Sequence, residues 1–227
     1  MQERLSKIRS GLQGFAGASY PPQLLAVSKG QPASQIKALY DLGHRHFGEN
    51  YAQEMIEKME LLADACPDIC WHFIGKIQKR QAKSILRAQW IHSVGSEKEM
   101  SYLSKHASAD GGWKILLQVN IAREPQKGGF LPESLEHFET PPLNGDGFHL
   151  SGLMCLPPFG HSETKGAHFF SETRLLRDKL AEKWECRLPE LSMGMSADYE
   201  LAMSEGATWV RIGTFLFGPR PQKPKTE

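Results

Sequence analysis

One lysine follows directly on a short apolar segment near the amino end of the chain. The segment runs from Leu24 to Ser28, and Lys29 and Gly30 come next. A run of this length and composition is typical of a buried strand, so the Lys29 amine is expected at the mouth of an apolar element. Desolvation there disfavours the ammonium form, and an uncharged primary amine is a nucleophile for an aldehyde. The plainer alternative is a solvated turn residue.

Two segments near the carboxyl end predict a phosphate site. Ser192 and Ser196 flank a Met-Gly-Met run, and Gly213 and Thr214 follow another apolar segment. Ser196 is expected to be the N-cap of a helix over 197–205. Glycine lets the backbone approach an anion, and free amides at a helix start donate to it. Together with the lysine, these segments predict a phosphate-bearing aldehyde, for which pyridoxal phosphate is the natural candidate.

Short apolar segments alternate along the chain with amphipathic stretches. The expected strands are Leu24–Ser28, His46–Gly48, Trp71–Ile74, Trp90–Val94, Lys114–Asn120, His149–Cys155, Glu190–Met193 and Thr208–Ile212. Eight strand–helix units in 227 residues favour an α/β fold with a closed parallel (β/α)8 TIM barrel. A doubly wound open sheet would give similar local patterns. In a barrel the chemistry lies at the carboxyl ends of the strands, where Lys29 and both phosphate segments fall.

The rest of the chain predicts a single domain. An amphipathic segment over 2–12 is expected to form an extra amino-terminal helix outside the barrel. No linker divides residues 1–218, which are expected to form one barrel domain that binds the cofactor. The tail over 219–227 is rich in proline and lysine and is expected to be flexible.

Composition excludes several classes of function. Lys and Arg total 27 against 26 Asp and Glu, so the net charge of +1 favours neither nucleic acid nor a membrane surface as partner. The four cysteines, Cys66, Cys70, Cys155 and Cys186, lack paired metal-ligand spacing, so no metal site is expected. No bilayer-spanning run or leader is found, and a reduced cytoplasm is the expected location.

Six segments, in order from the first expected strand to the last, closely resemble the pyridoxal phosphate homeostasis protein family. They are Ala26–Lys29, Phe47–Tyr51, Trp71–Gly75, Gly152–Met154, Leu191–Ser196 and Arg211–Thr214. The resemblance covers the chain apart from its two ends. The family is similar in its barrel to the amino-terminal domain of the fold-type III alanine racemases.

The resemblance implies a cofactor held as an internal aldimine on Lys29, with Arg211 facing the pyridine nitrogen. Because arginine does not give up its proton, that nitrogen would stay largely unprotonated and the cofactor would be a weaker electron sink. The other implied contacts are Ser192, Ser196, Gly213 and Thr214 to the phosphate, and Asn50, His72 and Met154 to the ring. As an alternative, His72 is a core histidine beside Trp71 and Phe73.

A second lysine and two departures from the family pattern complete the site predictions. Lys127, in the loop after the fifth strand, could accept the aldehyde from Lys29 by imine exchange, or it is a solvated loop charge. Where the family commonly has a lysine, two residues after Lys29, this chain has Gln31. The segment Lys76–Gln81 keeps only the glutamine of the family's run.

The resemblance implies a protein that buffers the cofactor in vitamin B6 homeostasis and hands it to cofactor-requiring apo-enzymes. The second acid–base domain of the racemases is missing, so no catalytic residue is assigned and a monomer is expected. One alternative is a slow amino-acid racemase that uses Lys29 on one face and Tyr51 or His72 on the other. Another is a Schiff-base aldolase that needs no cofactor and would be colourless.

Overall fold

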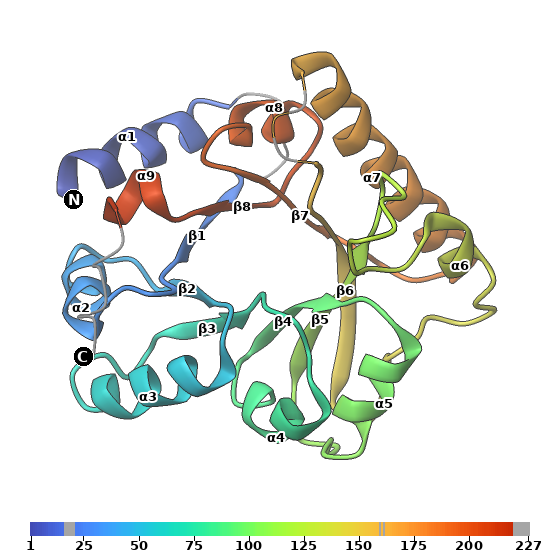
Figure 1. The fold of residues 1–227 in the computed structure, drawn as a ribbon, viewed down its shortest axis with the longest axis horizontal. Coiled ribbons are helices and arrows are strands. Elements are labelled where there is room, and N and C mark those ends of the chain that lie inside the picture. The colour runs from blue at the N-terminus through green and yellow to red at the C-terminus, as the bar shows by residue number, and fades with distance from the viewer. Residues whose placement is uncertain (16–20, 159, 161, 220–227) are drawn as a thin grey trace.

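The eight predicted strands form one closed, all-parallel barrel in which each strand pairs with its sequence neighbours and β8 pairs with β1. In the computed structural model, residues 1–15, 21–158, 160 and 162–219 are described. The strands are β1 (Gln23–Val27), β2 (His46–Glu49), β3 (Cys70–Phe73), β4 (Trp90–Val94), β5 (Trp113–Val119), β6 (Phe148–Cys155), β7 (Glu190–Met195) and β8 (Trp209–Ile212). Figure 1 looks along the barrel. The TIM-barrel prediction is therefore confirmed, and the open-sheet alternative is wrong.

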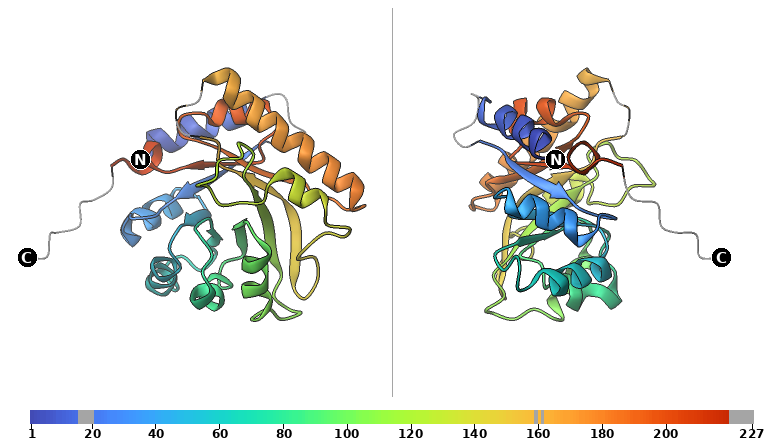
Figure 2. Two further views of the ribbon diagram at one scale, coloured as in Figure 1. Left: turned by 45° about the vertical axis from the view of Figure 1, so that its right-hand side comes forward. Right: turned by 90° about the vertical axis from the view of Figure 1, so that its left-hand side faces the viewer.

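Helices cover the outside of the barrel. They are α2 (Ala33–Asp41), α3 (Ala52–Leu62), α4 (Ala82–Ile85) with the short 3-10 turn η1 (Lys79–Gln81), α5 (Glu97–Ser104), α6 (Pro132–Glu136), α7 (Glu163–Lys183), α8 (Tyr199–Ser204) and α9 (Thr214–Phe217). In each longer helix, residues at helical spacing are buried against the strands, as Met55 and Leu62 are in α3. Figure 2 shows α7 lying along the outside of the barrel, next to α6.

The predicted amino-terminal helix is confirmed as α1 (Gln2–Gln13), which lies beside β1 and α9 outside the barrel (Figure 1). It buries Leu5, Ile8 and Leu12, which recur at helical spacing. Residue 219 is exposed, and the rest of the tail predicted to be flexible, 220–227, lies outside the described residues. Among the helices of the described ranges, none has the length and apolar character needed to cross a membrane.

Two hydrophobic clusters hold the fold together. The larger cluster lies between the strands and the helices. The smaller cluster fills the barrel interior with Leu25, Trp90, Leu116, Met154 and Trp209. Buried His72, His92 and Ser192 add polar groups at positions that branched apolar residues fill in most barrels of this kind. The interior therefore has an apolar wall and a polar row of side chains.

Candidate functional site

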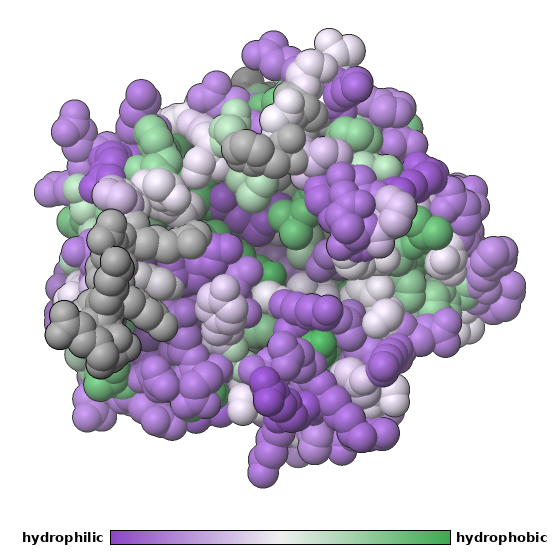
Figure 3. Space-filling view, viewed as in Figure 1, coloured by the Kyte–Doolittle hydropathy of each residue, from purple (hydrophilic) through white to green (hydrophobic). Residues whose placement is uncertain are grey.

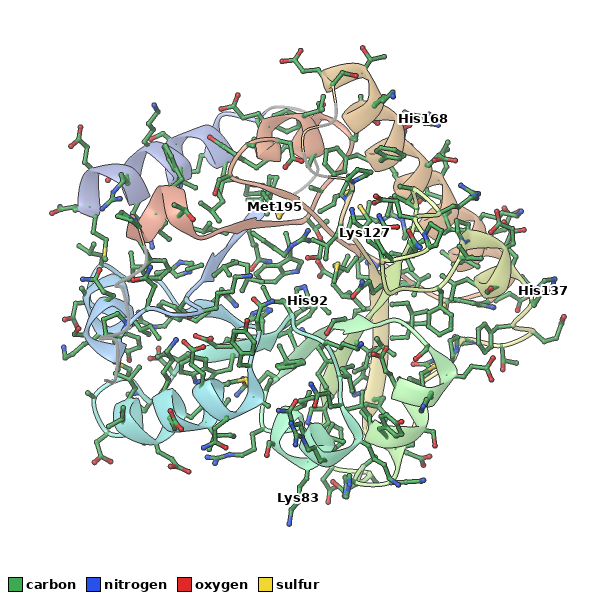
Figure 4. The ribbon with its side chains drawn as sticks, viewed as in Figure 1. Lys83, His92, Lys127, His137, His168 and Met195 are labelled. Carbon is green, nitrogen blue, oxygen red and sulfur yellow. The ribbon has the colours of Figure 1, made fainter. Side chains whose placement is uncertain are left out.

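A cavity of about 260 Å³ opens where the strands end at the carboxyl face of the barrel. We call it the Lys29 pocket, and it is lined by Val27, Lys29, Gln31, Asn50, Ile74, Met154, Leu156, Met195, Ser196, Arg211, Gly213 and Thr214. Figure 3 shows the hollow near the centre of this face, where hydrophilic and hydrophobic residues meet. Figure 4 labels Met195 there, the last residue of β7. Seven of the nine predicted cofactor contacts lie in this lining; Ser192 and His72 do not.

Lys29 is half-buried in the turn that follows β1. Both of its neighbours are tied to acidic side chains. The Ser28 hydroxyl donates to Glu49 Oε1 at 2.6 Å, and the Gly30 amide donates to Glu54 Oε1 at 2.6 Å. Gly30 has a φ of +70°, a left-handed conformation that glycine adopts without strain. The turn is thus held on both sides of the lysine.

A buried ion cluster lies beneath this turn. Lys58 Nζ is 2.6 Å from Glu49 Oε1 and 2.7 Å from Glu54 Oε1, and it donates to the Ser28 carbonyl at 2.7 Å. We call Ser28, Glu49, Glu54 and Lys58 the Lys58 cluster. Burial raises the pKa of Glu49, although the Lys58 ammonium and the Ser28 hydroxyl oppose that rise. The cluster fixes the backbone that presents Lys29 to the pocket.

Arg211 brings a buried cation to the floor of the pocket. Its Nη1 donates to Ser192 Oγ and its Nη2 donates to the Cys155 carbonyl, both at 2.9 Å. Burial lowers the pKa of the guanidinium, but arginine remains charged at neutral pH. Ser192 is fully buried beneath Arg211. The structure therefore places Ser192 as a partner of the arginine, outside the pocket lining, and its expected contact with the phosphate stays a prediction.

A row of three imidazoles continues from Ser192 through the barrel interior. His92 Nδ1 lies 3.0 Å from Ser192 Oγ, His92 Nε2 lies 2.9 Å from His72 Nδ1, and His72 Nε2 lies 3.1 Å from His46 Nδ1. We call His92, His72 and His46 the histidine chain, and Figure 4 shows His92 near the centre of the barrel. His72 is fully buried and stacks on Trp90, so its core alternative fits its position better than a contact with the ring.

The arginine favours one order of donors and acceptors along this row. Because Arg211 can only donate, Ser192 Oγ accepts from it, and the buried hydroxyl then donates to His92 Nδ1. In this order His92 and His72 each donate from Nε2 to Nδ1 of the next ring, and all three imidazoles are neutral. Desolvation favours that form, because burial lowers the pKa of His92 to about 3 and lowers the pKa of His72 and His46 as well.

Three of the residues predicted to bind the phosphate form a rim of the Lys29 pocket. Ser196 and Thr214 are exposed and Gly213 is half-buried, all three facing the cavity. A Cβ on Gly213 would come within 3.2 Å of the Val27 carbonyl oxygen, so a side chain there would crowd the rim. The first turn of α9 leaves the amides of Thr214 and Phe215 without acceptors inside the helix. Backbone donors, a hydroxyl and open space are what an anion requires.

The prediction that Ser196 caps a helix is wrong. The helix α8 begins at Tyr199, and its N-cap is Asp198, whose Oδ1 accepts from the Met195 amide at 2.6 Å. Ser196 instead lies in the turn between β7 and α8, where its side chain is exposed at the pocket. Asp198 thus accepts a hydrogen bond from the amide of the residue after Gly194, a glycine with a φ of +87°. The turn is therefore formed before the helix starts.

Asn50 carries a buried side-chain oxygen, Oδ1, that has no hydrogen-bond partner within the described chain. The residue lies in the pocket lining at the end of β2. Buried polar atoms are normally paired, so this oxygen is a position that a polar ligand would satisfy. With a lysine amine, an arginine and an anion rim, the pocket fits an aldehyde that bears a polar ring and a phosphate.

The second lysine lies outside this pocket. Lys127 Nζ is 2.6 Å from Glu124 Oε2 and donates to the Leu156 carbonyl at 3.3 Å. It lines a neighbouring cavity of about 420 Å³ in the loop after β5. Leu156 lines the Lys29 pocket, so this hydrogen bond ties Lys127 to a residue of that pocket. The relay role of Lys127 stays a prediction.

Sequence reasoning missed several lining residues. Gln31 was noted only as a departure, yet its buried side chain lines the pocket. Ile74, Leu156 and Met195 supply apolar lining and belong to or follow strand ends that the barrel rule had singled out. Tyr51, offered as a second acid–base group, is 64% exposed and is not part of the lining.

Comparison with known proteins gives a consistent match across the chain. A family model described as the alanine racemase amino-terminal domain matches residues 4–221. The pyridoxal phosphate homeostasis protein of Aquifex aeolicus is 38% identical over 224 residues, which cover 96% of this chain and 97% of that protein. The human protein of the same name is 35% identical, with 90% of this chain and 78% of that protein covered.

Solved structures show the same barrel. PipY of Synechococcus elongatus, with pyridoxal phosphate bound, is 39% identical, matches with a TM-score of 0.85, and covers 96% of this chain and 99% of its own. The alanine racemase of Corynebacterium glutamicum matches with a TM-score of 0.70 at 15% identity, over 98% of this chain and 63% of its own. At that identity the likeness extends to the fold.

Proposed function

The chain belongs to the pyridoxal phosphate homeostasis protein family, and we propose that it binds pyridoxal 5'-phosphate in the Lys29 pocket as an imine of Lys29. We infer that it acts as a carrier and buffer of this cofactor in vitamin B6 homeostasis. The observation that carries the proposal is the meeting of Lys29, Arg211 and the Gly213–Thr214 rim in one pocket. PipY, 39% identical and with pyridoxal phosphate bound, supports the same ligand here.

The cofactor supplies an aldehyde, and the chain supplies the amine. Lys29 Nζ, once deprotonated, adds to the aldehyde carbon, and the carbon–nitrogen double bond forms as the carbonyl oxygen leaves in water with two protons from the nitrogen. The Lys58 cluster holds the turn on both sides of the nucleophile, so the amine is presented without the entropy cost of ordering a free loop.

The remaining lining residues divide by their chemistry. Ser196, Gly213 and Thr214 would hold the phosphate, while Met154 and the unpaired Asn50 oxygen would contact the ring. Arg211 would donate to the pyridine nitrogen, and Ser192 and the Cys155 carbonyl hold its guanidinium in place. An arginine at that nitrogen keeps it unprotonated and weakens the ring as an electron sink.

The lining of the Lys29 pocket favours binding of the cofactor over catalysis of racemisation. Within the described residues, the titratable side chains of the pocket are Lys29 and Arg211, whereas efficient racemisation needs a second acid–base group on the other face. The candidates for that group, His72 and Tyr51, lie outside the lining. We propose that residues 1–218 form the cofactor-binding unit, working in the cytoplasm as a monomer that delivers to cofactor-requiring apo-enzymes.

The absorption spectrum of the purified protein loaded with pyridoxal phosphate tests this proposal. We expect a visible band that borohydride bleaches, that Lys29→Ala lacks, and that the matched control Lys127→Ala keeps. A spectrum identical to free cofactor in the unaltered protein would refute the imine. Racemisation of alanine faster than by free cofactor would refute the carrier assignment in favour of the racemase.

A further inference from the structure

The amino end of the barrel, opposite the Lys29 pocket, brings together two histidines and a cysteine. His46 and Cys70 are the first residues of β2 and β3 and are register partners, and His72 lies two residues further along β3. The nitrogen and sulphur atoms that these side chains offer all lie within 4.8 Å of one another. His46 and Cys70 are half-buried whereas His72 is buried, so solvent reaches the cluster from one side.

We propose that His46, Cys70 and His72 form a binding site for a thiophilic divalent metal ion, of which Zn²⁺ is the best match. Imidazole and thiolate ligands select zinc over magnesium or calcium. Three protein ligands and an open position reached by solvent leave room for a water as the fourth ligand. The expectation from cysteine spacing, that no metal site exists, did not consider ligands brought together by strand register.

The nitrogen spacing already suits tetrahedral coordination. His46 Nδ1 and His72 Nε2 are 3.1 Å apart. Two nitrogens bound about 2.0–2.1 Å from zinc at a tetrahedral angle would be roughly 3.4 Å apart. The pair therefore needs to open by only a few tenths of an ångström, and the Cys70 sulphur lies within 4.8 Å of the ligand nitrogens of both histidines.

The proposed ligands have neighbouring side chains of the kind that usually orient metal ligands. His72 Nδ1 lies 2.9 Å from His92 Nε2, and Cys70 packs against the interior cluster that contains Trp90. A histidine that binds metal through one nitrogen typically donates from the other, which fixes its ring. A metal ion on His72 Nε2 would make His72 Nδ1 the donor to His92 Nε2. The direction of this hydrogen bond would then be the reverse of that in the histidine chain without metal.

The charge balance at the site comes from the thiol and one lysine. On binding, Cys70 loses its proton to solvent and a sulphur–metal bond forms, so one negative charge offsets part of the ion's charge. Lys114 Nζ lies 4.7 Å from the centre of the Trp90 ring, and its positive charge repels the metal ion. Its residue is exposed, so water screens this repulsion, and the same ammonium favours the thiolate.

Titration with Co²⁺, a spectroscopic substitute for zinc, tests the proposal on the full chain. We expect one ion per chain, a thiolate-to-metal charge-transfer band, visible bands of tetrahedral intensity, and loss of all of them when Zn²⁺ is added in equal amount. Cys70→Ser should abolish the charge-transfer band, and His46→Asn should weaken binding at least tenfold. Cys186→Ser, another half-buried cysteine, is the matched control and should leave the spectrum unchanged.

Folding of each variant is checked by circular dichroism, and both substitutions lie at half-buried strand starts where the barrel tolerates them better than at buried His72. A titration without a thiolate band in the unaltered protein overturns the proposal, as does a band that survives in Cys70→Ser. Lys29→Ala must keep the metal signal, which separates this site from the cofactor pocket.

Discussion

Removing the ammonium of Lys58 should destabilise the protein more than any exposed lysine could. In Lys58→Met the aliphatic stem keeps its packing, but Glu49 loses its counter-ion. The side chains of Lys58 and Glu49 are 7% and 0% exposed and their charged atoms are 2.6 Å apart. Breaking one partner of a buried pair costs about 3–5 kcal/mol, a large share of the roughly 5–15 kcal/mol by which a domain is stable.

The control is Lys37→Met, which breaks a pair of the same type on the surface. Lys37 and Asp41 are 48% and 54% exposed, and an exposed pair of this kind contributes little to stability because water and salt screen the two charges. The assay is urea unfolding followed by circular dichroism, with the midpoint and slope compared among the unaltered protein and the two variants. The double variant Glu49→Gln/Lys58→Met, which removes the orphaned charge, should recover part of the loss.

The loss should also depend on pH. Burial raises the pKa of Glu49 above its ordinary 4.5, and without Lys58 the main opposing effect is gone, so its pKa rises further. A raised carboxyl pKa means that the folded state holds the proton more tightly than the unfolded state. Stability therefore falls as pH rises from about 4.5 toward the folded pKa, by up to about 1.4 kcal/mol per pH unit. Lys58→Met should be less destabilised at pH 5 than at pH 8.

The Lys58 prediction extends to the pocket, because Lys58 donates to the Ser28 carbonyl next to Lys29. A loosened turn should weaken cofactor binding roughly tenfold, equivalent to about 1.4 kcal/mol. The reasoning is refuted if Lys58→Met loses no more stability than Lys37→Met, or if its loss is larger at pH 5 than at pH 8.

Three further predictions follow from contacts in and around the pocket. Gly75→Ala would place a Cβ 1.8 Å from the Asn50 carbonyl oxygen and should lower the free energy of unfolding by more than about 2 kcal/mol, as measured by urea unfolding. The control is Gly11→Ala, whose Cβ would have its nearest neighbour beyond the helix's own backbone at 3.9 Å and which should be neutral or stabilising. Ser192→Ala leaves a buried guanidinium donor unpaired and should cost about 1–3 kcal/mol in the same assay; a change below about 0.5 kcal/mol would contradict it. Burial raises the pKa of Cys155 to about 11, so peptide mass spectrometry should find it unalkylated by iodoacetamide at pH 8 in the folded protein, and equal reaction rates with and without urea would oppose this.

The barrel could be predicted from the sequence because short, largely apolar segments alternate with longer amphipathic stretches eight times along the chain. Strand runs such as Trp90–Val94 are buried along their whole length and differ clearly from the amphipathic stretches between them. The carboxyl ends of the parallel strands of a barrel converge on one face, and this rule predicted that Lys29, Asn50, Arg211 and Gly213 lie together there.

Positions along the barrel axis were harder to predict. Ser192 lies within β7 and is buried under Arg211, whereas Ser196 directly follows the strand and is exposed at the rim. The register between β7 and β8 shifts between Ser192 and Met195, and alternation along a strand does not reveal such a shift. The stagger of strands in a closed barrel likewise decides that His72 lies below the pocket.

The residue to which the cofactor attaches tests the proposed imine on Lys29 most directly. Protein loaded with pyridoxal phosphate is reduced with borohydride, digested with trypsin, and mapped by peptide mass spectrometry. We expect the reduced cofactor on Lys29, with cleavage after that residue blocked. An adduct found mainly on Lys127, or spread over exposed lysines as in an unfolded control, would contradict it.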